Sequence, residues 1–135
     1  MALLSACLVV LAAPPTKPSK LFTVESPEKN DVILPGYDIW VHTERDGGKD
    51  GEMYKRNPSI SIFFQSATSE SDINEFIEYV DYRVLSGHGY FFKVKQEWFN
   101  TKKPQEKFRL RLTFRLGSAH GYVDSENFFL KLKDS

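Results

Sequence analysis

The chain is poor in the residues that form disulfides and metal sites. Cys7 is the only cysteine among 135 residues, and there are three histidines. One thiol cannot form a disulfide within the chain, so the fold must rest on its core, and a domain of this length buries roughly two-thirds of its unfolded surface. A charge excess is also lacking, because 18 basic residues balance 18 acidic ones. We therefore expect no nucleic-acid partner.

Apolar runs of membrane-spanning length are missing as well. The longest run, MALLSACLVVLAA at residues 1–13, carries no charge and ends in two alanines before Pro14. It is shorter than the roughly 20 residues of a membrane-spanning helix and is typical of a secretory signal peptide, with a buried N-terminal element as the alternative. We expect a signal peptide over 1–13, a Pro-rich linker over 14–19 and one domain over 20–135. This organisation predicts a secreted protein, extracellular or in the cell wall, without a stable membrane anchor.

The sequence does contain many aromatic residues, at 14%, and repeated alternation of apolar and polar side chains. The clearest example is FRLRLTFRL at 108–116, where Phe and Leu alternate with Arg and Thr. An alternation of period two is the signature of a strand with one buried face. Further strands are predicted over 20–24, 37–43, 59–65, 90–99 and 128–133.

Two segments are harder to interpret. Residues 43–58 contain three glycines and many charges, and we predict a long charged loop there. Residues 71–84 fit both helical and strand spacing, and we favour a helical turn at 72–76 followed by a strand. About seven strands separated by turn signals predict an all-β fold, an antiparallel β-sandwich of the immunoglobulin or fibronectin type III-like class.

No pattern of residues indicates a metal site. Asp46 and Asp50 match two ligand positions of an EF-hand calcium loop, but Asn57 stands where the loop requires a glutamate. A solvated loop is the better interpretation. His88 and His120 both lie in glycine-flanked turns that a sandwich could bring together to bind a metal. The alternative is that they occupy these positions only because turn residues tolerate unusual backbone angles. We expect no metal and no cofactor.

Catalytic patterns are equally weak. The segment GSAHG at 117–121 has the wrong order for a serine nucleophile elbow. The carboxylates of Asp72, Glu75, Glu78 and Asp81 could pair as a glycosidase acid and base, but their three-residue spacing predicts the wet face of a helical turn. We therefore expect no catalytic residues and no enzymatic activity.

Two sets of residues are candidates for ligand binding. The first is a basic face on two strands, able to meet an anionic polymer or an acidic partner if those strands are neighbours; a solvated, self-paired face is the alternative. Its members are Lys93, Lys95, Arg109, Arg111 and Arg115. The second is a set of aromatic side chains that would stack on sugars if exposed, although large aromatics are more often core residues. Its members are Trp40, Tyr90, Trp98 and Phe99.

Five stretches together carry a family resemblance: FTVESPEKNDVILPGYDIWVHT, SISIFF, GYFFKVKQEW, KFRLRLTF and GYVDSENFFLKL. They resemble the immunoglobulin-like N-terminal domain of fungal secreted cell-wall proteins, the yeast cell-wall synthesis family and its Ser/Thr-rich glycosylphosphatidylinositol-anchored relatives. The shared positions are Phe22, Ser26-Pro27, Pro35-Gly36, Trp40, Trp98, 108–112, Asp124-Ser125 and Phe128. The resemblance spans about residues 20–133 and implies a role connected with fungal wall β-glucan.

The residues and the resemblance together predict a secreted, non-catalytic binding module associated with the organisation or assembly of fungal cell-wall β-glucan. Its partner would be cell-wall polysaccharide or a wall protein. The alternative is a secreted effector or protein-interaction module whose target is a host or neighbouring protein.

Overall fold

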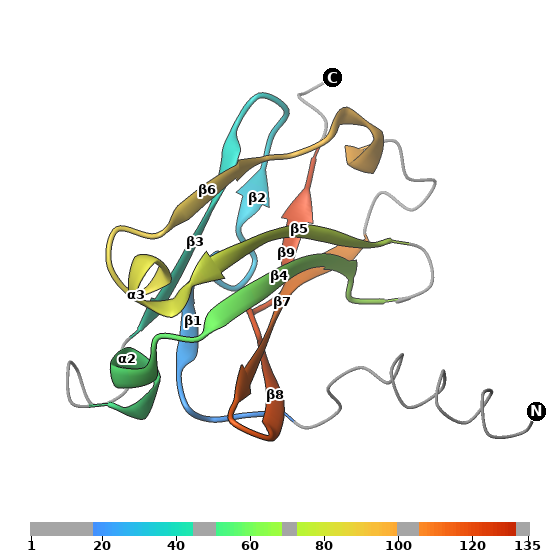
Figure 1. Ribbon diagram of the computed structural model, residues 1–135. Coiled ribbons are helices and arrows are strands. Elements are labelled where there is room, and N and C mark those ends of the chain that lie inside the picture. Colours follow the sequence, from blue (N-terminus) through green and yellow to red (C-terminus); the bar gives the residue numbers. More distant parts are fainter. Residues whose placement is uncertain (1–17, 45–50, 69–72, 100–105, 132–135) are drawn as a thin grey trace, which may run out of the picture.

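The computed structural model describes residues 18–44, 51–68, 73–99 and 106–131, which form a mostly β structure (Figure 1). The strands are β1 (Thr23–Ser26), β2 (Val32–Ile33), β3 (Asp38–Glu44), β4 (Ser59–Ser66), β5 (Asn74–Asp81), β6 (Tyr90–Lys93), β7 (Lys107–Leu116), β8 (Ala119–Asp124) and β9 (Phe128–Leu130). The short helices are α2 (Glu52–Arg56), α3 (Tyr82–Leu85) and the 3₁₀ helix η2 (Gln96–Phe99). None of the helices in the described residues is long and apolar enough to cross a membrane.

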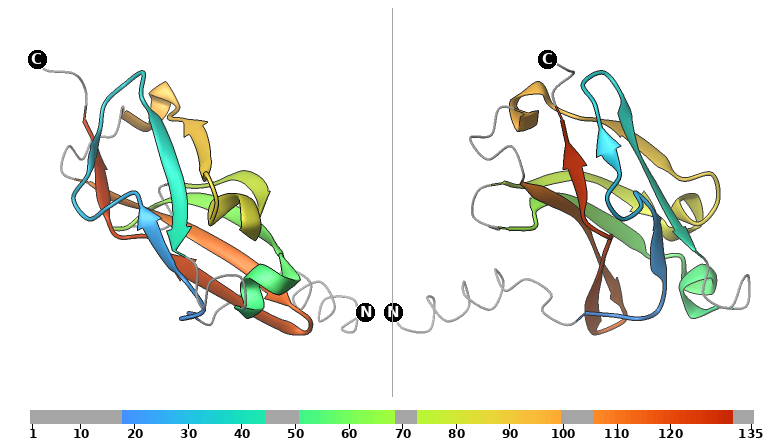
Figure 2. Two further views of the ribbon diagram at one scale, coloured as in Figure 1. Left: turned by 90° about the vertical axis from the view of Figure 1, so that its left-hand side faces the viewer. Right: turned by 180° about the vertical axis from the view of Figure 1, so that it is seen from behind.

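Two sheets pack against each other, which confirms the predicted all-β sandwich. One sheet has three strands in the order β1-β3-β6. The other has six, in the order β2-β9-β7-β4-β5, with β8 paired to β7. The strand pairs are antiparallel except for β2 and β9, which run parallel. Figure 2 shows the two layers from the side and from behind. The short strand β2 and the strand β8 raise the predicted number of about seven strands to nine.

The core lies between the two sheets and follows the alternation in the sequence. Along β7, Phe108, Leu110 and Leu112 are buried, and the intervening arginines face outward. The opposing sheet contributes Ile39 and Val41 of β3, which are fully buried. Burying each such side chain contributes about 1.5–3 kcal/mol, so these strands together supply much of the folding free energy. The predicted strand at 108–116 and its inward residues are confirmed.

The segment at 71–84 differs from the prediction, because the strand comes first and the helical turn follows it. Strand β5 pairs with β4, and α3 begins only at Tyr82, whose ring is buried. A register shift between Ile62 and Phe63 leaves Ile77 without a partner on β4. Such a bulge adds one residue and breaks the period of two, which explains why the sequence looked helical here. Residue 72 lies outside the described residues.

The charged segment before β4 is also more structured than predicted. Residues 45–50 lie outside the described residues, but α2 follows them and buries Met53. The helix ends at Asn57, which has a left-handed backbone (φ 46°) and donates its N–H to the Met53 carbonyl. Asparagine tolerates this conformation better than most residues, so the helix stops there. The prediction of an uninterrupted loop was wrong.

Candidate functional site

The single basic face predicted from the sequence does not form, because its strands belong to different sheets. Strand β6 lies at the edge of the three-stranded sheet, whereas β7 is in the middle of the six-stranded sheet. Lys93 is exposed and lies opposite Asp38 of β3. Lys95 follows β6, and its Nζ lies 2.9 Å from Oε1 of Glu75 on β5. The condition on which the basic face depended is therefore not met.

The arginines of β7 are instead held by neighbours on their own sheet. Arg111 forms a bidentate ion pair with Asp124 of β8, with Nε–Oδ1 and Nη2–Oδ2 distances of 2.8 and 3.0 Å. Its guanidinium carbon also lies 4.0 Å from the centroid of the Tyr122 ring. Arg109 donates from Nε to Oε1 of Gln65 at 3.0 Å. These arginines are fixed in orientation.

The remaining arginine of the set lies near the end of β7. The side chain of Arg115 is exposed, and its Nε donates to the carbonyl of Gly117 at 3.0 Å in the turn between β7 and β8. It lies opposite His120 of β8. Arg115 thus bonds only within its own turn in the described structure. Of the predicted basic set, Arg109 and Arg111 are the two that lie close to the same carboxylate, that of Asp124.

Trp98 is a core residue, so the prediction that it offers an exposed ring was wrong. The side chain is 2% exposed, and the indole stacks on Phe64. The indole N–H donates to Oε2 of Glu75. Tyr90 is half-buried and packs against the core, and the side chain of Phe99 lies outside the described residues. The alternative interpretation of these aromatics as core holds for Trp98.

Trp40 is 38% exposed, but its ring surface is already engaged. His42 stacks on it with 4.8 Å between centroids, and Phe91 lies nearly parallel to it at 6.1 Å. The indole N–H donates to the carbonyl of His88 at 3.0 Å, while Nε2 of His42 lies 2.9 Å from the carbonyl of Gly87. Trp40 and His42 therefore fasten the turn before β6 to β3. A sugar would have to displace these contacts to stack on the indole.

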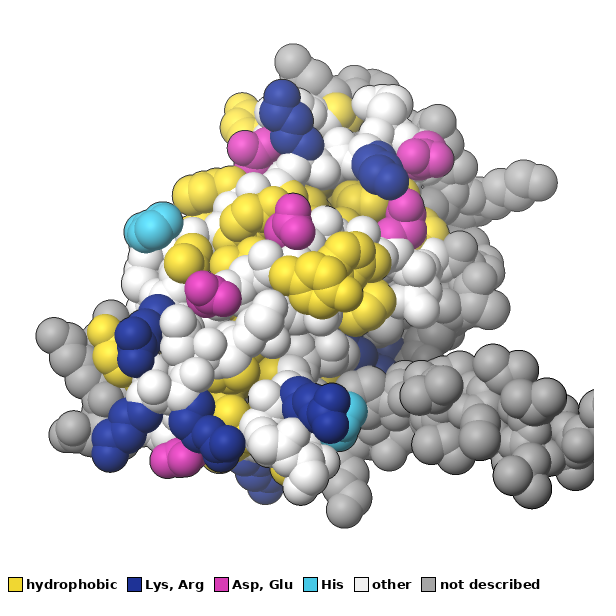
Figure 3. Space-filling model, viewed as in Figure 1, with side chains coloured by type: hydrophobic (Ala, Val, Ile, Leu, Met, Phe, Trp, Pro, Cys, Tyr) yellow, Lys and Arg dark blue, Asp and Glu magenta, His cyan; other side chains and the backbone are white. Residues whose placement is uncertain are grey.

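A second group of accessible rings lies on the outer face of the six-stranded sheet, and sequence reasoning missed it. We call Phe63, Phe76 and Tyr79 the β5 aromatic cluster. Phe76 and Tyr79 are 45% and 64% exposed, their centroids are 4.7 Å apart, and Phe63 packs edge-on to Phe76 at 5.7 Å. Figure 3 shows hydrophobic side chains gathered over the region of β5. One signal was available, since Phe63 takes an outward position in the alternation of β4.

The β5 aromatic cluster is continuous with the fixed arginines. Across the sheet, Phe76 lies opposite Phe63, Phe63 opposite Arg111, and Arg111 opposite Asp124. The pair of Gln65 and Arg109 lies in the next outward row. We call Gln65–Arg109 and Arg111–Asp124 the polar pairs. Exposed rings beside planar hydrogen-bonding groups suit a ligand with both apolar faces and hydroxyl groups.

On the other side of β5, Glu75 joins the two sheets electrostatically. The hydrogen bond from Lys95 holds the pKa of Glu75 below its usual range, assisted by the indole N–H of Trp98, while partial burial opposes the shift. The same carboxylate raises the pKa of Lys95. Both groups are therefore charged near neutral pH. Glu75 is a structural ion-pair partner. Glu75, Glu78 and Asp81 lie on strand β5 and not on the predicted helical turn, and Asp72 lies outside the described residues.

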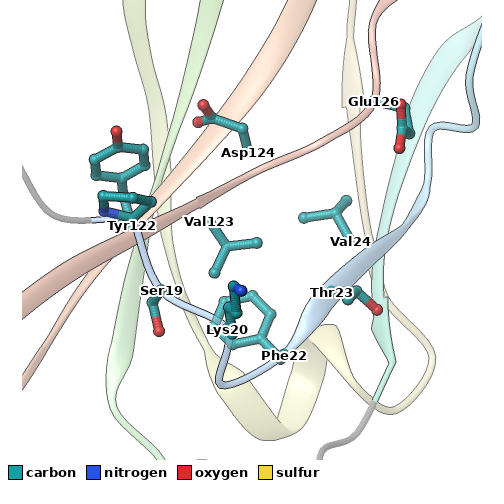
Figure 4. A pocket seen from close by; sticks show the side chains of 10 residues that line it. Ser19, Lys20, Phe22, Thr23, Val24, Tyr122, Val123, Asp124 and Glu126 are labelled. Carbon is teal, nitrogen blue, oxygen red and sulfur yellow. The ribbon is translucent and has the colours of Figure 1, made fainter.

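An open cleft of about 460 Å³ lies between β1 and β8 (Figure 4). Phe22, Val24 and Val123 group at its centre, and the carboxylates of Asp124 and Glu126 lie apart from each other. A glycosidase site needs two carboxylates facing one bond, which this cleft does not provide. Across the described parts of the chain, no three His, Cys, Asp or Glu side chains are grouped to hold a metal ion. The expected absence of catalysis and cofactors stays a prediction.

In comparisons with known proteins, no family model, no curated protein and no solved structure matches this chain.

Proposed function

We propose that this chain is a secreted, non-catalytic module that binds fungal cell-wall polysaccharide, with β-glucan as the first ligand to test. The observation that carries the proposal is that Phe76 and Phe63 of the β5 aromatic cluster lie in one row with the Arg111–Asp124 pair on an outer sheet face, with Tyr79 in the adjacent outward row. The family resemblance of the sequence supplies the ligand class. The β5 aromatic cluster and the neighbouring polar pairs are the surface that supports the proposal.

In this proposal the exposed rings contact the apolar face of a sugar, and the polar side chains bind its hydroxyl groups. The exposed surfaces of Phe76 and Tyr79 offer apolar area to the C–H face of a pyranose. The partly exposed side chains of Arg109, Arg111 and Asp124 offer donors and acceptors to its hydroxyl groups, whereas Gln65 is buried and serves to hold Arg109. Because Arg111 and Asp124 already fix each other, binding does not have to order these side chains, which lowers its entropic cost. A polymer also offers many equivalent sites, so a weak single contact gives measurable retention.

The test is sedimentation of the purified chain with insoluble β-glucan, chitin and a cellulose control at physiological salt. We expect selective retention on glucan, and its loss in Tyr79→Ala and in Phe76→Ala. Tyr37→Ala is the matched control, because Tyr37 is the same residue type with nearly the same exposure, 66% against 64%, and lies outside the cluster. Circular dichroism of each variant shows whether the fold is kept.

Two outcomes would contradict the proposal. If the chain stays in the supernatant with all three polysaccharides, polysaccharide binding is wrong and the alternative of a protein target takes its place. If Tyr37→Ala loses retention as completely as Tyr79→Ala, the ligand is glucan but the β5 aromatic cluster is not its site. Trp98→Ala is unsuitable here, because replacing a core residue removes binding by unfolding.

A further inference from the structure

Among the described residues, strand β5 is a terminal strand of the six-stranded sheet, with β4 as its only partner (Figure 1). It is eight residues long, NEFIEYVD, and contains no proline and no lysine. A long edge strand presents unpaired backbone groups that can pair with another chain, and proteins block such edges with proline, with charged side chains, lysine above all, or with β-bulges. The edge of β5 lacks proline and lysine, so what protects it is its acidic side chains and the bulge at Ile77.

One backbone group on this edge is covered by a side chain. The N–H of Tyr79 donates to Oε1 of Glu78 at 2.9 Å, so this amide is not used in the ladder with β4. A carboxylate that satisfies a free amide can be drawn away by a cation, whereas a neutral group has no comparable hold on it. The Glu78 carboxylate therefore occupies the Tyr79 N–H until a cation draws it away.

The charge on β5 selects the kind of strand that could pair with it. Its three acidic residues face no basic residue on the same strand, and only Glu75 has an ion pair among the described residues. Glu78 and Asp81 remain without a cation there. Figure 3 shows acidic side chains around the hydrophobic surface over β5. A second copy of this chain would place carboxylates against carboxylates, which disfavours pairing of two β5 strands.

We propose that the free edge of β5 binds an extended, basic segment of another protein by strand addition. Main-chain hydrogen bonds extend the sheet by one strand, and a Lys or Arg of the incoming segment takes the Glu78 carboxylate and frees the Tyr79 amide. Alternate side chains of that segment pack on Phe76 and Tyr79, which are exposed beside the edge. This interaction shares Phe76 and Tyr79 with the proposed polysaccharide site and differs from it in using the backbone of β5.

The experiment is titration of the full chain with a labelled, end-blocked heptapeptide of alternating lysine and valine, followed by fluorescence anisotropy. We expect saturable binding that weakens with salt, and none with the glutamate–valine counterpart. Two further peptides carry N-methyl groups on all lysine amides or on all valine amides. Only one of these sets of amides faces β5, so one methylated peptide loses binding and the other keeps it.

The chain offers matched variants and a direct reporter. Glu78→Gln is expected to bind the peptide roughly two- to fivefold more weakly, the range for an exposed ion pair. Glu28→Gln, an exposed glutamate outside β5, is expected to bind unchanged. Hydrogen exchange of the Tyr79 amide is expected to slow when the peptide is bound. Equal binding of both methylated peptides, or of the glutamate–valine peptide, would overturn the proposal.

The two proposals fail separately. Loss of glucan retention in Tyr79→Ala with no binding of the lysine–valine peptide would leave the polysaccharide site and remove the strand-addition site. Peptide binding by a chain that ignores all three polysaccharides would do the reverse.

Discussion

The indole of Trp98 lies face to face with the ring of Phe64, with 4.0 Å between the ring centroids and 9° between the planes. Phe64 belongs to β4 in the six-stranded sheet, whereas Trp98 belongs to η2, which follows β6 of the other sheet. Phe92 of β6 packs edge-on against the same indole. Trp98 thus connects both sheets at one side of the sandwich.

Replacing Trp98 with alanine is expected to lower the free energy of unfolding by about 3–5 kcal/mol, because a large buried ring leaves a cavity. Trp98→Phe keeps a ring against Phe64 and loses the N–H donor to Glu75, so we expect a smaller loss. Urea unfolding followed by circular dichroism measures both. Phe91→Ala is the control: this side chain is 57% exposed, and we expect a change below about 1 kcal/mol. Equal losses in Trp98→Ala and Phe91→Ala would contradict the core assignment.

The ion pair of Glu75 and Lys95 predicts a pH dependence of stability. The hydrogen bond from Lys95 lowers the pKa of Glu75 in the folded chain. The folded state therefore resists protonation of this carboxylate more than the unfolded state does. The resulting stabilisation is present above the ordinary glutamate pKa and is lost as the pH falls through the lowered, folded value.

Glu75→Gln tests this dependence, because glutamine keeps an acceptor for the Trp98 N–H and removes the charge. We expect the difference in melting temperature between the natural chain and Glu75→Gln to be largest near about pH 7 and to shrink toward about pH 3. The Glu75 side chain is 36% exposed, so water screens the pair and the difference is modest. A difference that stays constant over this range would show that the charge of Glu75 does not contribute.

The turn before β6 predicts an unequal response of two glycines. Gly89 and Gly36 both have positive φ, at 85° and 90°. A Cβ on Gly36 meets no atom within 4 Å, so Gly36→Ala costs only the strained backbone, about 1–2 kcal/mol. A Cβ on Gly89 would collide with the indole nitrogen of Trp40 and lie 2.8 Å from the carbonyl oxygen of Val41. We expect Gly89→Ala to cost about 2–5 kcal/mol in urea unfolding. Similar losses at the two positions would show that Trp40 moves aside freely.

The predicted strands at 37–43, 59–65 and 108–116 correspond closely to β3, β4 and β7, because each has an uninterrupted alternation. The predictions failed where the period is broken. The bulge at Ile77 made a strand look helical, and the helix α2 is too short for its single buried residue, Met53, to show a period. The strand β8 has only Val123 as a buried aliphatic residue, so its alternation is weak.

The candidate site was predicted only in part. Arg109 and Arg111 were named from the sequence and do lie on an outer sheet face, but their partners Gln65 and Asp124 come from β4 and β8. The rings that accompany them, Phe76 and Tyr79, were not named. Their exposure depends on the side of β5 to which the bulge turns them, and a bulge has no reliable mark in a single sequence.

The sequence by itself determined which side of each regular strand is buried, because alternating side chains point to opposite faces of a strand whatever its neighbours are. It also determined that the fold rests on an ordinary hydrophobic core, because a chain with one thiol cannot form an internal disulfide and balanced charges leave no excess of one sign. Only the tertiary structure decided which strands are neighbours, since alternation carries no information about the partner strand. The strand order places Lys93 and Arg111 on different sheets and buries Trp98 against Phe64. It also leaves Phe76 and Tyr79 exposed on the outer face beside the free edge of β5.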